Sequence, residues 1–106
     1  MIEIEKGSTN VYGDIGKPDA DRMFVKAILA SKIGEIIRQR KLTQQRAAEI
    51  LNMPQPKLSG LLRGQFWGIS EAKMLTCMNF LGSDVEIIIH TPGLDYSRGD
   101  TRVTFA

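Results

Sequence analysis

Hydrophobic residues recur at helical spacing through the first half of the chain. Between residues 19 and 40 they follow one another at intervals of four, four and three, which is the period of an amphipathic helix. The positions are Val25, Leu29, Ile33 and Ile36. Asp19 and Asp21 suit the start of a helix, because carboxylates are favourable at its N-terminus. Gly34 is unfavourable inside a helix by about 1 kcal/mol relative to alanine, so we expect it to permit close packing.

Two short helices follow. Thr43 is a good N-cap for a helix over residues 44–51, which the segment Asn52-Met53-Pro54 ends. A second helix is expected from about Gln55 to near Gly64, since proline is tolerated in a first helical turn.

The pattern then predicts one more helix and a change of period. Ser70 caps a helix that ends at Gly82, with Met74, Leu75, Met78 and Leu81 facing inward. Residues 85–91 and 101–105 alternate as strands do, and residues 92–100 are rich in turn formers, so we expect a C-terminal β-hairpin. Ile2-Glu3-Ile4-Glu5 also alternates, but such a short strand needs a partner elsewhere. The expected fold is mostly α, with residues 1–18 as a flexible N-terminal arm, 19–82 as the helical domain and 83–106 as the hairpin.

Charge adds an asymmetry to this picture. The chain has 106 residues and a net charge of +2, of which residues 23–63 contribute +6 and the segments on either side −2 each. A basic block is often only a solvated surface, but a basic centre between acidic ends also suits an anionic partner, and nucleic acid is the common one.

Residues 43–63 meet the steric requirements of a helix-turn-helix. Ala48 is the small residue that allows the second helix to approach, and Asn52 accepts the left-handed backbone of the turn. Apolar residues for the inner side lie at suitable offsets, at Leu51, Met53, Leu58 and Leu61. The alternative is a plain helical hairpin in a bundle. Agreement between the small residue, the turn residue, the apolar offsets and the basic surroundings favours DNA binding.

The segment LTQQRAAEILNMPQPKLSGLLRG (42–64) resembles the helix-turn-helix of the phage-repressor (Xre/Cro) class. A closer resemblance runs over residues 10–90, where NVYGDIG, KIGEIIRQRKLTQ, QPKLSGLLRG and LGSDVEIIIH occur in the order found in HigA-like Xre antitoxins. That resemblance implies a repressor of its own operon that neutralises a ribonuclease toxin of the RelE/HigB type. The chain departs from the usual pattern at Pro54, where serine or threonine is typical, and at Gly60, where a side chain is usual.

The second helix of such a motif enters the major groove with its N-terminal end at the base edges. We expect base contacts from Gln55, Lys57, Ser59 and Gly60. Gln55 can bond adenine through N6 and N7, and Lys57 can reach guanine or a phosphate. Pro56 is better explained by helix initiation than by contact with a thymine methyl group. We expect phosphate contacts from Arg38, Arg40, Thr43, Gln44, Arg46 and Arg63. Each of these arginines has plain solvated charge as its alternative.

One such module contacts only a few base pairs, so we expect a homodimer on an inverted repeat in double-stranded DNA. The hairpin is the expected dimer interface, because its first strand is too apolar for an open edge. The interface residues would be Val85, Ile87, Ile88 and Ile89.

Other chemistry has little support in the sequence. The chain has one cysteine, Cys77, and one histidine, His90, so we expect no disulfide, metal site, cofactor or catalytic centre. Cys77 is interpreted as a core residue. Trp67 is expected to cover the core between the third and fourth helices, with partner binding as the alternative. No signal peptide or membrane segment is apparent, which favours the cytoplasm. A stand-alone Xre-type repressor without a toxin and a protein-interaction module that does not bind DNA remain alternatives to the antitoxin.

Overall fold

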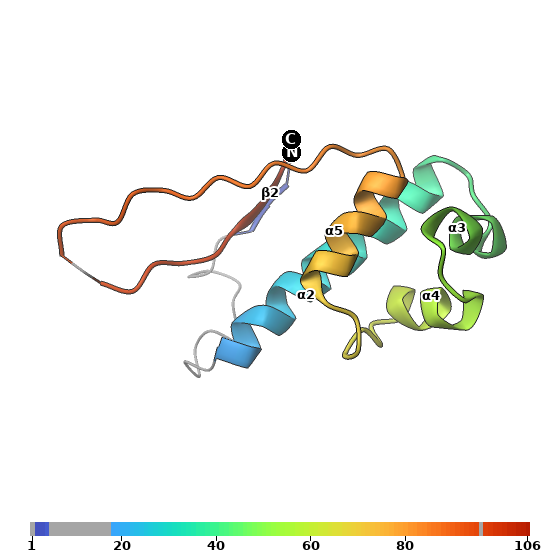
Figure 1. Ribbon diagram of the computed structural model, residues 1–106, viewed down its shortest axis with the longest axis horizontal. Coiled ribbons are helices and arrows are strands. Elements are labelled where there is room, and N and C mark those ends of the chain that lie inside the picture. Colours follow the sequence, from blue (N-terminus) through green and yellow to red (C-terminus); the bar gives the residue numbers. More distant parts are fainter. Residues whose placement is uncertain (1, 5–17, 96) are drawn as a thin grey trace.

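The computed structural model describes residues 2–4, 18–95 and 97–106, and residues 2–4 and 18–22 by their backbone only (Figure 1). The elements run in the order β1 (Ile2–Ile4), α2 (Pro18–Gln39), α3 (Gln44–Leu51), α4 (Gln55–Leu62), α5 (Glu71–Phe80) and β2 (Val103–Phe105). The predicted mostly helical helix-turn-helix fold is therefore confirmed. The expected N-terminal arm falls largely outside the described residues.

The long helix α2 forms one side of the core. Leu29, Ile33 and Ile36 on it are buried, as the spacing predicted, and Val25 is partly buried against the same core. Gly34 is buried as well, and a Cβ atom there would lie 3.3 Å from Leu62 Cδ2 on α4. The expectation that Gly34 permits close packing is confirmed, since even a Cβ atom there would force the Leu62 side chain to shift.

Four predicted helix ends have the expected local geometry. Thr43 Oγ1 accepts a hydrogen bond from Arg46 N at 3.0 Å, and Ser70 Oγ accepts one from Lys73 N at 3.0 Å. Asn52 ends α3 in the left-handed conformation with φ 52°, and Gly82 follows α5 with φ +93°. These short-range interactions fix where α3 and α5 begin and end.

The remaining helices close over α2. In Figure 1, α5 lies along α2, while α3 and α4 sit together at one end of the molecule. The most completely buried large side chains come from all four helices and the residue after α5: Ile33, Leu51, Leu58, Leu61, Met74, Cys77 and Leu81. This core fixes α4 relative to the rest of the domain, and α4 is the helix predicted to contact DNA.

The C-terminal hairpin prediction is wrong. Residues 85–91 form no strand, and β2 instead pairs antiparallel with β1, with Ile2 opposite Phe105 and Ile4 opposite Val103. Lys32 Nζ lies 4.9 Å from the ring centroid of Phe105, which attaches β2 to α2. The alternating Ile2–Ile4 segment thus supplied a partner for the C-terminal strand. The chain between α5 and β2 is left as a long extended loop, which we call the extended segment (83–102) (Figure 1).

Candidate nucleic-acid interface

The helix α4 presents polar side chains from its N-terminal half. Its N-cap is Pro54, which leaves the first backbone N–H groups without a side-chain partner. Gln55 and Lys57 are exposed, and Ser59 is half-buried. The Arg63 guanidinium donates a hydrogen bond to Ser59 Oγ at 2.9 Å, so these two side chains form a single polar unit on α4. The arrangement offers amide, ammonium and hydroxyl groups to a ligand outside the domain.

Gly60 was expected on the same exposed face and is not there. It is buried, and a Cβ atom at this position would lie 3.4 Å from Gln65 Oε1 and 3.7 Å from the Gln65 backbone oxygen. Gln65 N donates a hydrogen bond back to Gly60 O at 2.8 Å. The missing side chain at position 60 therefore makes room for the chain leaving α4, and the expectation of a base contact from Gly60 is wrong.

Two of the predicted phosphate contacts come together beside α4. Arg38 and Gln44 both line an open groove between α2 and α4, with Gly34 and Leu62 among its other residues. Gln44 is the first residue of α3, where the helix N-terminus and its free N–H groups favour an anion. Thr43 precedes it and is exposed, although its hydroxyl oxygen already caps α3.

The other predicted phosphate contacts differ in their surroundings. Arg46 is exposed and pairs with Glu49 at 3.3 Å, a surface ion pair that contributes little to stability. Arg40 is turned the other way: a Cβ atom on Gly82 would lie 2.6 Å from the Arg40 Nη2 atom. The guanidinium of Arg40 thus covers the end of α5, where a cation is favourable, rather than the groove beside α4.

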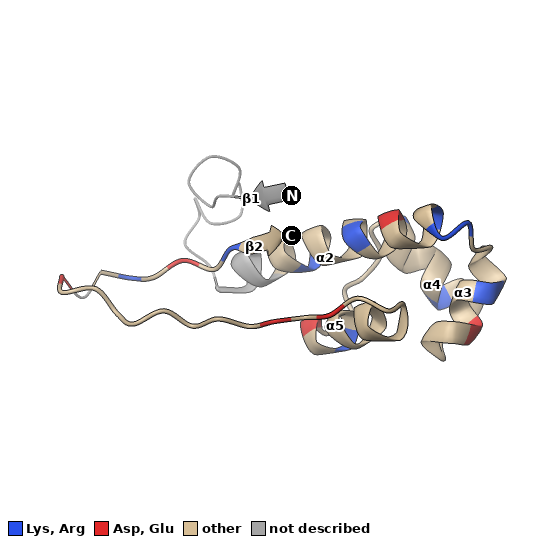
Figure 2. Ribbon diagram, turned by 90° about the horizontal axis from the view of Figure 1, so that it is seen from above, with Lys and Arg blue, Asp and Glu red and all other residues tan. Residues whose placement is uncertain are grey.

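The charge distribution agrees with this placement. Figure 2 shows basic positions over α3, α4 and the adjoining end of α2, whereas acidic positions recur along the extended segment. Residues 50–70 contain no aspartate or glutamate. The exposed part of α4 and the chain after it therefore carry no negatively charged side chain that would repel an anion.

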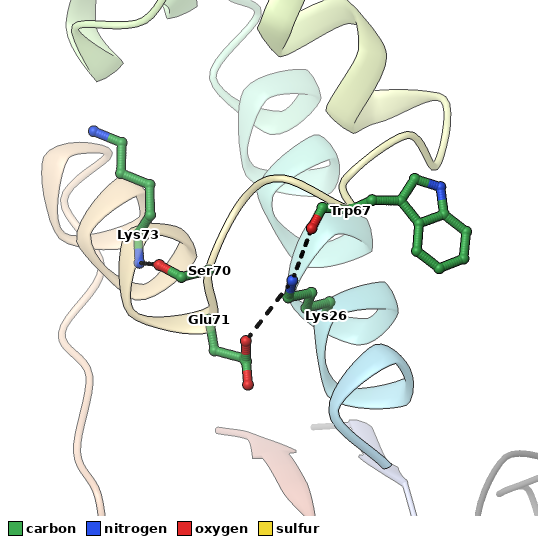
Figure 3. A network of polar contacts seen from close by, with 5 residues as sticks. All are labelled: Lys26, Trp67, Ser70, Glu71 and Lys73. Carbon is green, nitrogen blue, oxygen red and sulfur yellow. Dashed lines mark hydrogen bonds and ion pairs between the residues drawn. The ribbon is translucent and has the colours of Figure 1, made fainter. Parts of the chain in front are cut away.

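Sequence reasoning missed a buried cation behind this surface. The side chain of Lys26 on α2 is buried, with 7% of the residue exposed, and its Nζ donates to Trp67 O at 3.4 Å and lies 4.0 Å from Glu71 Oε1 (Figure 3). It had been counted only as part of the basic block. Its position among the apolar residues of α2 did not predict its burial, because a lysine side chain is normally solvated.

The expectation for Trp67 is wrong. Trp67 is 74% exposed, and its neighbours Phe66 and Ile69 are the residues that are buried in the core.

Cys77 is buried as expected, and burial raises the pKa of its thiol. No three His, Cys, Asp or Glu side chains among the described residues are placed to share a metal ion. None of the helices in the described part of the chain is long and apolar enough to cross a membrane.

Comparison with known proteins identifies the family. Residues 11–90 match the family model described as a helix-turn-helix domain. A solved structure of a chain described as an XRE-family transcriptional regulator superposes with a TM-score of 0.78 at 32% sequence identity, covering 84% of this chain and 100% of that one. No curated protein matches the sequence. On this evidence the chain belongs to the helix-turn-helix family of DNA-binding transcriptional regulators of the XRE type.

Proposed function

We propose that the protein is a dimeric, sequence-specific repressor that binds an inverted repeat through two copies of α4. The observation that carries this proposal is the set of exposed polar groups on α4 beside the groove formed by Arg38 and Gln44. Gln55, Lys57 and Ser59 contact base edges, and Arg38, Thr43, Gln44, Arg46 and Arg63 contact phosphates. Base contacts select sequence, whereas phosphate contacts position the protein on the duplex. A DNA target of this kind implies a cytoplasmic location.

A test of these roles compares one residue of each kind. Gln55→Ala removes a group that can bond adenine, and we expect it to relax base preference at one position of each half-site by about 1–3 kcal/mol. Arg38→Ala should weaken binding to all sequences by similar factors. Binding to a panel of single-base operator variants, measured by fluorescence anisotropy of labelled DNA, distinguishes the two. The reverse pattern would show that the roles are misassigned.

The dimer is proposed to form through residues 85–91. Residues 85–91 make no backbone–backbone hydrogen bond to another described residue, although several large apolar side chains lie there. Ile87, Ile88 and Ile89 are 72%, 67% and 90% exposed, while Val85 packs against the core. An extended apolar segment with unpaired backbone groups is a template for strand pairing with another chain. A second copy supplies the same sequence in the same conformation, so antiparallel pairing of the two segments is self-complementary about a two-fold axis.

Sedimentation velocity at micromolar concentration tests the dimer. Ile89→Lys places a charge in the proposed contact and should shift the protein to monomer. Leu94→Lys is the matched control, because Leu94 is 97% exposed but lies outside residues 85–91, and it should stay dimeric. A wild-type protein that is monomeric both alone and on DNA, or an Ile89→Lys variant that stays dimeric, would contradict the proposal.

A second function, as an antitoxin, is supported by the resemblance over residues 10–90 and by Leu94. That side chain lies at the far turn of the extended segment, beyond the proposed dimer contact, and is available to a RelE/HigB-type ribonuclease toxin. The adjacent gene decides this: it should encode a protein of similar size that arrests growth alone and is harmless when co-expressed with this chain. Leu94→Asp should lose that protection while DNA binding is retained. Absence of such a gene would leave a stand-alone repressor, and negligible DNA binding at any salt concentration would leave an interaction module.

A further inference from the structure

The connector between α4 and α5, residues 63–70, is fixed to the domain at several points. Phe66 and Ile69 are buried, and Ile69 N donates a hydrogen bond to Phe66 O at 3.1 Å. Between them, the Trp67 carbonyl oxygen accepts a hydrogen bond from Lys26 Nζ at 3.4 Å, and Lys26 is itself 4.0 Å from Glu71 Oε1 (Figure 3). The backbone at position 67 is therefore held from inside the protein by a buried cation.

The side chain of Trp67 points the opposite way. Figure 3 shows the indole directed away from Lys26 and α2, and 74% of the residue is exposed. Its Nε1–H donates to no acceptor among the described residues. Gly68, beside it, has nothing within 4 Å of a Cβ position, so the chain next to Trp67 also borders open space. The backbone of Trp67 is thus held in place, whereas its large aromatic ring is exposed to solvent.

The place of this side chain in the fold points to DNA. The connector leaves the C-terminal end of α4, and the two lie along the same edge of the molecule (Figure 1). An eight-residue helix is about 12 Å long, which is about the width of the major groove. If the N-terminal end of α4 meets the bases, chain that continues past its C-terminal end comes to the sugar–phosphate backbone at the rim of the groove.

The chemistry of the ring fits that backbone. Indole Nε1–H is a donor only, and phosphate oxygens are acceptors only, while the ring face can pack against deoxyribose. Residues 50–70 carry Lys57 and Arg63 but no acidic residue, so an anionic strand is not repelled. We propose that Trp67 is an operator-backbone contact, positioned by the buried Lys26, that clamps the end of α4 against the rim of the major groove. This proposal depends on DNA binding through α4.

The ring provides its own probe, because Trp67 is the single tryptophan of the chain. Titration of the full-length protein with duplex DNA that contains its operator should change the tryptophan fluorescence with the same midpoint as a mobility-shift assay. Trp67→Ala should weaken operator and unrelated DNA by similar factors, about tenfold per half-site, which corresponds to about 1.4 kcal/mol. Trp67→Phe keeps a ring but loses the donor, and should fall between wild type and Trp67→Ala. Phe80→Ala removes another exposed aromatic residue, 51% exposed on α5, and should bind as wild type does.

The positioning role of Lys26 has to be tested by a measurement that a general loss of stability would not change. Lys26→Met removes the donor to the Trp67 carbonyl, and should weaken DNA binding as Trp67→Ala does while tryptophan fluorescence anisotropy falls in the free protein. Lys26→Arg keeps a donor, so its DNA affinity and its tryptophan fluorescence anisotropy should both match those of the wild type.

Two results together would overturn the proposal and leave DNA binding through α4 intact. They are wild-type protein that binds DNA with unchanged fluorescence, and Trp67→Ala or Trp67→Phe binding as tightly as wild type. Wild-type protein that shifts no DNA would refute the repressor itself. Tryptophan fluorescence that responds to a protein partner but not to DNA would assign Trp67 to that partner and also overturn the proposal.

Discussion

Arg38→Gln gives a quantitative test of the groove beside α4. The substitution removes one charge from an exposed position and keeps a polar side chain. Arg38 forms no ion pair with another described residue, so the change breaks no internal salt bridge in that part of the chain. Any effect on DNA binding is therefore expected to come from the phosphate contact itself.

The magnitude follows from counterion release. Each phosphate neutralised by a cation contributes about −0.9 to the slope of log K against log salt. Three arginines, at positions 38, 46 and 63, face phosphates in each proposed protomer, which predicts a slope of about −5.4 for the dimer. Arg38→Gln removes one contact from each protomer and should reduce the slope to about −3.6. Between 50 and 200 mM salt, the wild-type affinity should fall about 2,000-fold and that of the variant about 150-fold.

The assay is fluorescence anisotropy of labelled operator DNA at four or five salt concentrations. Arg40→Gln is the matched control, with the same loss of charge two residues along the chain. Successive helical residues are about 100° apart, so Arg38 and Arg40 point to nearly opposite sides, and Arg40 lies over Gly82. Arg40→Gln should leave the slope at the wild-type value. Equal slopes for wild type and Arg38→Gln, or a reduced slope only for Arg40→Gln, would refute this geometry.

Three further predictions concern the scaffold that holds α4. Thr43→Ala removes the acceptor for Arg46 N and should lower the free energy of unfolding by about 1 kcal/mol in urea titrations, with Thr43→Ser restoring it. Gly82→Ala places a Cβ atom 2.6 Å from Arg40 Nη2 at a φ of +93°, and should cost about 1–2 kcal/mol and lower the melting temperature by roughly 5–10 °C in calorimetry. Cys77 is buried with a raised thiol pKa, so native protein at pH 8 should react with an aromatic disulfide reagent far more slowly than unfolded protein; equal rates would show that the core opens freely.

The parts of the fold that sequence predicted well depend on local chemistry. Thr43, Asn52, Ser70 and Gly82 act on backbone groups within a few residues, so their residue types are enough to fix the ends of α3 and α5. The apolar spacing of α2 is likewise a property of one segment. These features were sufficient to predict the helix-turn-helix and the exposed positions of Gln55 and Lys57.

The error at the C-terminus involves a choice between distant partners. Val103–Phe105 was assigned to residues 85–91, which are near in sequence, but it pairs with Ile2–Ile4 from the other end of the chain. Strand pairing depends on which edge is within reach, and a period of two does not record that. Residues 85–91 consequently have no strand partner within the described chain, which is the reason for proposing a second copy.

The burial of single residues was also misjudged. Phe66 and Trp67 are both aromatic, and the sequence does not say which of them faces the core. Gly60 was taken as exposed because it lies among polar residues of α4, yet the chain turning back at Gln65 covers it. Lys26 was counted only within the basic block, although the Trp67 carbonyl and Glu71 provide partners for its ammonium group inside the protein.

Selection of duplexes from random DNA by the full-length protein tests the central claim most directly. The claim is that α4 of each protomer contacts one half of an inverted repeat. The account predicts enrichment of a two-fold symmetric sequence whose half-site centres lie about one helical turn, roughly 10–11 base pairs, apart. It also predicts that Gln55→Ala loses base preference at one symmetric pair of positions. Recovery of unenriched DNA, or the same enriched sequence with unchanged preference for Gln55→Ala, would contradict it.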